Sequence, residues 1–400
     1  MFAKKYLYKN NNEALIPGEP EINTAIIVVI PCFREPDIVQ TLESVKACYP
    51  PKSNVEVIVL INHSEIANHD VKSFNHKTKA ELDTWITNNS TDRICFYAVG
   101  PLSLKKKWAG AGLARKKGMD EAVRRFDLLE NPDGIIVSLD ADTLVDKNYL
   151  LEIENYFNKN KKHVGATITF EHQKHGLDKR QLEGILLYEK YLDYYKRALH
   201  FSGYPYSMFT IGSAFAVTAL AYVKRGGMNR RQAGEDFYFL QNLVQIGTVG
   251  EITSTKVYPS SRLSDRVPFG TGPILQKWMK GEEDLTLTYN FKTFRHLKLL
   301  FDNKELYYKI TETRFRSNLE KLPDSVSDFM LHDGFWNELN DLNQNCSNLI
   351  TFQNRFFQKF NAFKILKYLN FAHEKYFSKT CLPDQIKQLE QEILSQSNVE

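Results

Sequence analysis

Two aspartates, Asp140 and Asp142, stand one residue apart in the segment "GIIVSLDADTLVDKNYL" (residues 134–150). Carboxylates at positions i and i+2 of an extended or turning segment can both reach one divalent cation or its water shell. A structural role is also open, and the pair alone favours it: Asp140 would end a buried strand and Asp142 would cap a helix that starts near Asp146. The surrounding sequence must therefore decide between these roles.

The segments around the aspartates predict the elements that would position them. Apolar, β-branched runs indicate buried strands at residues 25–30, 55–61, 93–99 and 134–140. Helical patterns separate these runs, and such alternation is typical of right-handed βαβ units. We therefore predict an α/β fold with a mainly parallel, Rossmann-like sheet flanked by helices. A further strand is expected within 163–172, and a strand, a turn and a short helix within 204–228.

Polar residues follow several of these strands at the point where each one ends. Arg34 and Glu35 come after the first strand, residues 62–65 after the second, and Asp140 and Asp142 after the fourth. Ligands of open α/β sheets bind beyond the carboxyl ends of the strands. Three polar loops on one edge of the sheet favour a binding site over an isolated helix cap.

Composition sets broad limits on the function. The chain has 400 residues, a net charge of +4 and five widely spaced cysteines without a C-x-x-C pair. This mild charge does not call for nucleic acid, and the cysteines indicate reduced thiols rather than a disulfide framework. The first twenty residues lack the apolar region of a signal peptide. We expect a cytoplasmic protein, peripheral at the inner face of the membrane if it works at one.

The sequence changes character at about residue 282. Helical segments rich in aromatic and basic residues follow, and a polar helix that we expect to fray begins near residue 383. We predict an N-terminal extension over 1–23, an α/β domain over 24–281 and a helical region over 282–400. The aromatic stripes of that region indicate either a packed subdomain or an extension that binds a partner.

Other motifs with similar residues fit less well. In haloacid-dehalogenase-type phosphatases a threonine stands four residues after the first aspartate, whereas Leu144 occupies that position here and Thr143 is one place early. The segment "GAGLAR" begins like a dinucleotide-binding fingerprint, but Arg115 replaces its last glycine and no strand precedes it. No glycine is followed by Gly-Lys-Ser/Thr, so a P-loop is excluded.

Five segments, in one order, resemble the inverting family 2 glycosyltransferases, which have the GT-A fold. They are "AIIVVIPCFREPDIVQTLESV", "VEVIVLINHSE", "AGLARKKGMDEA", "VSLDADTLVDKNYL" and "GGMNRRQAGEDFYFLQNL", and together they span about residues 24–245. The resemblance implies a nucleotide-sugar half over about 24–145 and an acceptor half over about 146–281. The helical region after residue 282 lies outside it.

This resemblance implies a metal-dependent, inverting transferase of the hexosyltransferase type. Such an enzyme moves a sugar from a nucleotide-diphosphate sugar to an acceptor hydroxyl. By similarity, Asp142 ligates the metal directly, and Asp140 holds the ribose and supports the metal shell. Oxygen ligands favour Mg²⁺ or Mn²⁺, and such a cation neutralises the charge that develops on the diphosphate leaving group.

The family motifs also imply residues on the nucleotide side. Glu35 resembles the residue that approaches the nucleobase, and Arg115 resembles the one beside the nucleotide. Pro31 with Phe33 shapes the first loop. A UDP-sugar is the expected donor. The family usually has an Asp-Asp or Asp-Asn pair after strand two, and here Asn62 follows an isoleucine. Its amide could hydrogen-bond a base edge or cap a turn.

Asp236 occupies the position of the family's catalytic base, with Glu235 beside it. A base must take the proton from the acceptor hydroxyl as it attacks the anomeric carbon. The same two carboxylates suit the first turn of a helix, where negative charge meets the helix dipole. Both roles are compatible, because a helix start also orients a catalytic side chain.

The loop "YPSSRLSDRVPFGTG" places Arg262 and Arg266 after the last predicted strand. Both could bind the diphosphate through bidentate contacts, or they could be solvated. Tyr204 and Tyr206 could stack on the acceptor or lie in the core. The acceptor itself, a glycan, a lipid-linked molecule or a small molecule, is not specified by sequence. No nucleic acid is expected as a partner.

Three other functions remain open at this stage. One is a phosphatase of the Asp-x-Asp type, with Asp140 as its nucleophile. Another is a nucleotidyl-binding relative of the same fold that does not transfer a sugar. The third is a membrane-surface interaction protein that uses the basic, aromatic C-terminal helices as its interface.

Overall fold

The structure is a computed structural model of the chain and describes residues 1–10, 13–230, 234–264 and 270–397. It divides into two compact units. Unit 1 comprises residues 1–177 and 210–276, and unit 2 comprises residues 178–209 and 277–400. The contiguous domain boundary at residue 281 stays a prediction, but the segment 178–209 is grouped with the C-terminal helices.

Unit 1 is built on an eight-stranded sheet with the order β3-β2-β1-β4-β7-β6-β8-β5. Its strands are β1 (Thr24–Cys32), β2 (Asn54–Ser64), β3 (Ile94–Leu104), β4 (Ile135–Ser138), β5 (Leu144–Val145), β6 (Gly165–Phe170), β7 (Phe215–Thr218) and β8 (Val249–Tyr258). Strands β1 to β4 pair in parallel, as do β6 and β8, whereas β7 and β5 run antiparallel to their neighbours. The predicted α/β class is confirmed, with four parallel and three antiparallel strand pairings in the sheet.

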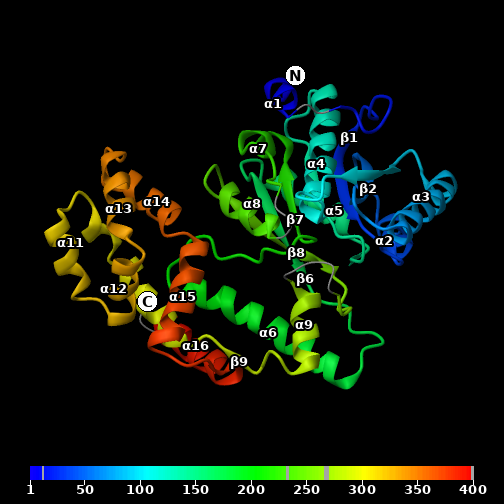
Figure 1. Cartoon of the computed structure of the whole chain (residues 1–400). Coiled ribbons are helices and arrows are strands. Elements are labelled where there is room, and N and C mark those ends of the chain that lie inside the picture. Colours follow the sequence, from blue (N-terminus) through cyan, green and yellow to red (C-terminus); the bar gives the residue numbers. More distant parts are fainter. Residues whose placement is uncertain (11–12, 231–233, 265–269, 398–400) are drawn as a thin grey trace. The chain divides into compact units, whose positions relative to one another are not determined.

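Helices cover both faces of this sheet (Figure 1). In unit 1 they are α1 (Lys4–Lys9), α2 (Ile38–Lys46), α3 (His69–Asn89), α4 (Ala111–Leu128), α5 (Tyr149–Lys159), α7 (Ala219–Lys224) and α8 (Glu235–Leu243). Helix α9 (Thr271–Lys280) crosses from unit 1 into unit 2. The sequence alternation of strands and helices is therefore realised as predicted in the first half of the chain.

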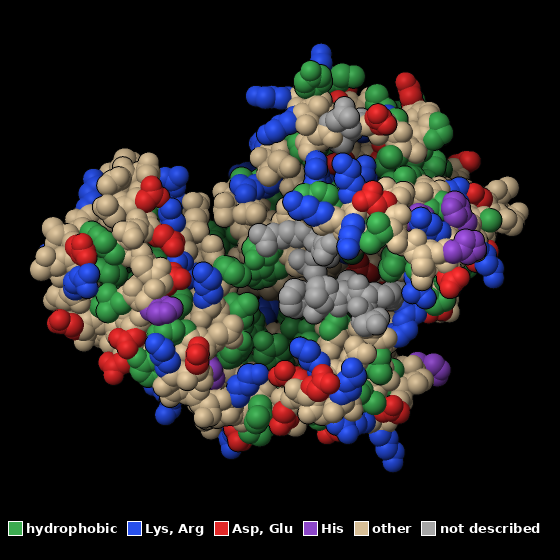
Figure 2. All heavy atoms as spheres, in the orientation of Figure 1, with side chains coloured by type: hydrophobic (Ala, Val, Ile, Leu, Met, Phe, Trp, Pro, Cys, Tyr) green, Lys and Arg blue, Asp and Glu red, His purple; other side chains and the backbone are tan. Residues whose placement is uncertain are grey.

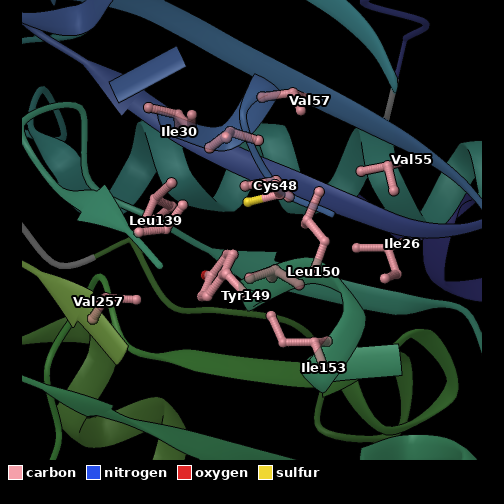
Figure 3. Packing of buried hydrophobic residues seen from close by; sticks show 14 of the residues in the cluster. Ile26, Ile30, Cys48, Val55, Val57, Leu139, Tyr149, Leu150, Ile153 and Val257 are labelled. Carbon is pink, nitrogen blue, oxygen red and sulfur yellow. The ribbon is translucent and has the colours of Figure 1, made fainter. Parts of the chain in front are cut away.

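The period-2 pattern of the strands divides the core between the two faces. Ile26 and Ile30 of β1 pack on one face with Leu150 and Ile153 of α5, as Figure 3 shows. Helix α4 lies against strand β1, and a Cβ atom on Gly118 of α4 would come within 2.4 Å of Val29 Cγ1. The glycine thus lets the helix approach the strand closely, and every residue from 26 to 30 is fully buried.

Strands β1 and β2 run further than their sequences predict, as does β3, which ends at Leu104 rather than at residue 99. Strand β1 continues through Pro31 to Cys32, although we expected Pro31 to interrupt it. The ladder between β1 and β4 ends where Val29 pairs with Ser138, so Pro31 lies beyond it and its missing N–H costs no hydrogen bond there. Strand β2 continues to Ser64, and the polar residues that we expected to form a turn extend the strand instead.

Unit 2 is helical, with a small two-stranded sheet. Its elements are α6 (Lys179–Phe201), β9 (Leu287–Thr288), α10 (Phe291–Asp302), the 3₁₀ helix η1 (Lys304–Tyr307), α11 (Glu312–Leu319), α12 (Asp324–His332), α13 (Phe335–Gln344), α14 (Leu349–Lys359), α15 (Ala362–Lys375), β10 (Thr380–Cys381) and α16 (Leu382–Ser397). The aromatic stripes form its core, where Phe301, Phe356 and Phe360 are buried and in ring contact.

Burial decides between two alternatives for Tyr204 and overturns one expectation for the C-terminal helix. Tyr204 is 1% exposed, and its hydroxyl accepts a hydrogen bond from the Ala362 N–H, so it belongs to the core rather than to an acceptor surface. The C-terminal helix α16 contacts α6 and α10 and fully buries Leu382 and Leu389, so it is packed over much of its length. Its apolar residues recur at helical spacing among polar ones, which made the segment look more solvated than it is.

Candidate active site

The loop after β1 is held in a sharp turn. Arg34 adopts a left-handed conformation with φ 47°, and its N–H donates to the Asn75 side chain at 3.2 Å. This turn sends the next side chain back toward the sheet, where Glu35 is 2% exposed. A buried carboxylate needs a partner of opposite charge or several hydrogen bonds.

The loop with the two aspartates follows β4 and is fixed by backbone contacts. The Thr143 N–H donates to the Asp140 carbonyl oxygen at 3.1 Å, and the Gln173 amide donates to the Asp142 carbonyl oxygen at 2.8 Å. Helix α5 begins only at Tyr149, with Asn148 as its N-cap residue. The alternative that Asp142 caps this helix is therefore wrong, and both carboxylates are left for other partners.

Three loops converge on one guanidinium group, which we name the Arg262 cluster (Arg262, Glu35, Asp37 and Asp142). Arg262 Nη2 lies 2.6 Å from Glu35 Oε2 and 3.5 Å from Asp142 Oδ2, and Nη1 lies 3.0 Å from Asp37 Oδ2. Burial lowers the pKa of the guanidinium, but the three carboxylates raise it, with a net rise. Arg262 therefore contacts two other predicted site residues, Glu35 and Asp142.

A second group, the Arg115 cluster (Arg115, Asp140, Glu235 and Asp236), joins the aspartate loop to helix α8. Arg115 is 3% exposed, and its two terminal nitrogens donate to Asp140 and Glu235. Burial lowers the pKa of Arg115, but the carboxylates of the cluster raise it, with a net rise. The Arg115 charge is thus shared between the loop after β4 and the start of α8.

Asp236 lies in the first turn of α8, as predicted. Gly234 precedes the helix with φ 69°, a left-handed conformation that glycine adopts at little cost, and the helix begins at Glu235. Burial raises the pKa of the Asp236 carboxyl to about 7, with a further rise from Glu235 and an opposing effect of Arg115. A carboxyl group with a pKa near 7 is suited to accept a proton at neutral pH.

The backbone at Gly212 packs closely against the Arg115 guanidinium and the Asp236 carboxylate. A Cβ atom on Gly212 would stand 2.8 Å from Arg115 Nη2 and 3.2 Å from Asp236 Oδ2. Ser138, the last residue of β4, fixes the glycine because its hydroxyl donates to the Gly212 carbonyl oxygen at 2.6 Å. No larger residue fits here without moving the guanidinium or the carboxylate.

The remaining predicted residues lie apart from these two clusters or outside the described residues. Asn62 is 2% exposed and donates to the Cys32 carbonyl oxygen at 3.2 Å, so its amide ties β2 to the end of β1 rather than capping a turn. Pro31 is buried within β1, and Phe33 is half-buried just after it. Arg266 falls outside the described residues, and its role stays a prediction.

Sequence reasoning missed three residues that build the site. Asp37 shares Arg262, and its signal was a second acidic residue two positions after Glu35. Gln173 holds the aspartate loop and accepts at its own carbonyl from the Ser261 hydroxyl, so it links the loops after β4 and β8. Gly212 had only the small-residue run "IGSAF" as a signal, which does not indicate a close approach.

The carboxylates suit a divalent cation that keeps water or phosphate ligands. Asp140 and Asp142 have side chains 36% and 27% exposed. No group of three or more His, Cys, Asp or Glu that could hold a metal occurs in the described part of the chain. Mg²⁺ is commonly bound through one or two carboxylates together with substrate phosphates, so these two oxygen donors fit such an ion.

Part of the sequence matches a known protein family. Residues 27–218 match the family described as Glycosyl transferase family 2. This part of the chain is a family 2 glycosyltransferase domain, and its mixed sheet flanked by helices is consistent with the GT-A fold. The match ends before α8, so Glu235, Asp236 and Arg262 lie beyond it.

Two solved structures are similar to the chain at low sequence identity. S. aureus TarS 1–349 in complex with UDP-GlcNAc has 11% identity and a TM-score of 0.44, over 84% of this chain and 92% of that chain. Mannosyltransferase PcManGT from Pyrobaculum calidifontis in complex with GDP-Man and Mn²⁺ has 12% identity and a TM-score of 0.38, over 93% of this chain and 92% of that chain. No curated protein sequence matches the chain.

The surface carries both signs of charge. On the face shown in Figure 2, Lys and Arg side chains are interspersed with Asp and Glu side chains over the described residues. Within the described ranges, no helix has the length and apolar character needed to span a bilayer.

Proposed function

We propose that this glycosyltransferase is a metal-dependent, inverting enzyme in which Asp236 is the general base. The observation that carries the proposal is the Asp236 carboxyl, which has a pKa of about 7 and lies at the start of α8 within the Arg115 cluster. At neutral pH a large fraction of this carboxyl is ionised, yet the group stays basic enough to take a proton.

The reaction balances with a single proton transfer. The acceptor hydroxyl attacks the anomeric carbon in line, the bond from that carbon to the diphosphate oxygen breaks, and the hydroxyl proton moves to Asp236. The nucleoside diphosphate leaves with the bonding electron pair, and Asp236 afterwards returns its proton to water. The hydroxyl attacks from the face opposite the diphosphate, so the configuration of the anomeric carbon is inverted.

Glu235 and Arg115 support the base rather than react. Glu235 is buried and accepts from Arg115, so its own carboxylate is already neutralised. Its negative charge raises the pKa of Asp236, and Arg115 limits that rise. Of the two predicted catalytic carboxylates, Asp236 is therefore the better base, and Glu235 is a positioning residue.

Asp142 is the residue proposed to ligate the cation, with Asp140 in support. A divalent cation at this place would act as a Lewis acid that stabilises the negative charge of the diphosphate leaving group. Arg262 lies next to Asp142 and can turn its guanidinium to phosphate oxygens. Asp140 would then remain paired with Arg115, in the same cluster as the catalytic base Asp236.

The donor we propose is a UDP-sugar, and the acceptor hydroxyl belongs to a glycan, a lipid-linked molecule or a small molecule. Glu35 and Phe33 lie in the loop after β1, which would approach the nucleobase of the donor. A cytoplasmic location is proposed from the pattern of free cysteines, and peripheral membrane contact from the basic and aromatic composition of the C-terminal helices. A phosphatase is disfavoured because the family match supports glycosyl transfer.

The experiment compares donors and tests Asp142 together. UDP-, GDP- and dTDP-sugars with Mn²⁺ are screened for an increase in melting temperature, and the selected donor is assayed for nucleotide release. We expect Mn²⁺-dependent release in the wild-type chain and almost none in Asp142→Asn. Asp133→Asn, which changes an exposed carboxylate in the same unit, is the control. Release without added cation, unchanged in Asp142→Asn, would contradict metal dependence.

A further inference from the structure

Arg262 makes three contacts of unequal length. Its shortest contact is with the buried Glu35 at 2.6 Å, the contact with Asp37 is 3.0 Å, and the contact with Asp142 is the longest at 3.5 Å. The first two partners belong to the loop after β1, and only Asp142 belongs to the aspartate loop. Arg262 is thus anchored on one loop and reaches the other at the limit of hydrogen-bonding distance.

The loops around Arg262 are held without it. In the loop after β1, the Asp37 N–H donates to Glu35 Oε1 at 3.1 Å. The aspartate loop is held by Gln173 on the Asp142 carbonyl oxygen and by the Thr41 hydroxyl on the Ala141 carbonyl oxygen. Removing the guanidinium therefore leaves these backbone contacts in place.

We propose that Arg262 is a positioning residue that acts as a built-in counter-cation, which competes with the divalent cation for Asp142. Without a nucleotide, the guanidinium neutralises Asp142 and weakens cation binding. When a nucleoside diphosphate brings its phosphates, Arg262 turns toward them while it stays near Glu35 and Asp37, and Asp142 becomes a cation ligand. This inference rests on the proposed role of Asp142 as a metal ligand.

The charges of the cluster fix the direction of the effect. Three carboxylates surround one guanidinium, so replacing Arg262 by a neutral side chain leaves a more negative cluster that attracts a divalent cation more strongly. A purely structural role predicts the opposite, because loops that separate would lose their shared ligand geometry. Arg262 is one-third exposed, so solvent screens its charge, and we expect about a tenfold change in affinity, equivalent to about 1.4 kcal/mol.

The test measures Mn²⁺ binding to the full chain in the absence of nucleotide, from the paramagnetic resonance signal of free Mn²⁺. We expect Arg262→Gln to bind Mn²⁺ about tenfold more tightly than the wild-type chain, and Arg262→Lys to bind it like the wild-type chain. Arg93→Gln makes the same charge change at an exposed site of unit 1 and should have no effect. Circular dichroism melting verifies that each variant is folded.

Each result separates this inference from the proposed function. Tighter binding in Arg262→Gln that is lost in the double variant with Asp142→Asn supports both. Equal or weaker binding in folded Arg262→Gln, with wild-type binding that depends on Asp142, overturns the competition and leaves the metal site standing. If Asp142→Asn removes no Mn²⁺ binding, either from the wild-type chain or from Arg262→Gln, both the inference and the proposed metal site are overturned.

Discussion

Replacing Asp236 by asparagine should change how the stability of the protein depends on pH. The carboxyl has a pKa of about 7 in the folded chain, against an ordinary value of 3.8. A carboxyl whose pKa is raised by folding stabilises the folded state at low pH, and this stability is lost as the pH rises toward the folded pKa. The neutral amide that Asp236→Asn introduces has no such titration.

The size of the effect follows from the pKa difference. Between pH 5 and pH 7 the unfolded carboxyl is ionised and the folded one still binds its proton, so stability falls by up to about 1.4 kcal/mol per pH unit. The expected loss over this range is about 2 kcal/mol for the wild-type chain relative to Asp236→Asn. In a protein unit of this size it corresponds to a melting temperature difference of about 4–8 °C.

The assay is thermal unfolding of both proteins at pH 5, 6, 7 and 8. The melting temperature of Asp236→Asn minus that of the wild-type chain should increase from pH 5 to pH 7, and this difference should level off above pH 7. Asp133→Asn, at an exposed carboxylate, should show no such trend. A difference between wild type and Asp236→Asn that stays constant from pH 5 to pH 8 would refute the reasoning.

Two further predictions concern packing around buried charges. Gly212→Ala places a methyl group 2.8 Å from Arg115 Nη2. Because two ion pairs hold the guanidinium, the rate of sugar transfer should fall by roughly tenfold or more. Initial rates, measured for a variant whose melting temperature is unchanged, check this, and full activity would contradict it. Arg125, fully buried, pairs with Glu56 at 2.5 Å, so Arg125→Met should destabilise the chain by about 3–5 kcal/mol. Urea unfolding should show that adding Glu56→Gln recovers much of this loss, and no recovery would contradict the account.

Local sequence patterns were sufficient to predict strands β1 to β4 of unit 1 and the helices between them, but not α1 or β5. Continuous apolar runs flanked by helical patterns identified strands β1 to β4, because buried parallel strands are apolar on both faces. Such runs do not specify direction, so the antiparallel course of β7 was not foreseen. The end of β1 was also missed, since a proline is tolerated where the ladder on one side of the strand has already ended, as it has here on the β4 side.

The site was predictable as a set of residues and less so as a set of contacts. The strand-end rule placed Glu35 and Asp142 together correctly, and the acidic start of α8 was identified. Arg115 was expected beside the nucleotide, and the structure buries it between two carboxylates. Which carboxylate a guanidinium selects depends on loops distant in sequence, as with Arg262 and Asp37, and no local spacing encodes that choice.

The catalytic role of Asp236 is tested most directly by one kinetic comparison. Transfer from the nucleotide sugar selected by the donor screen is measured for the wild-type chain and for Asp236→Asn at saturating donor and Mn²⁺, with nucleotide affinity measured in parallel. We predict a loss in turnover on the order of 10² or more, with nucleotide affinity close to that of the wild-type chain. Undiminished transfer by folded Asp236→Asn would contradict the assignment of the base.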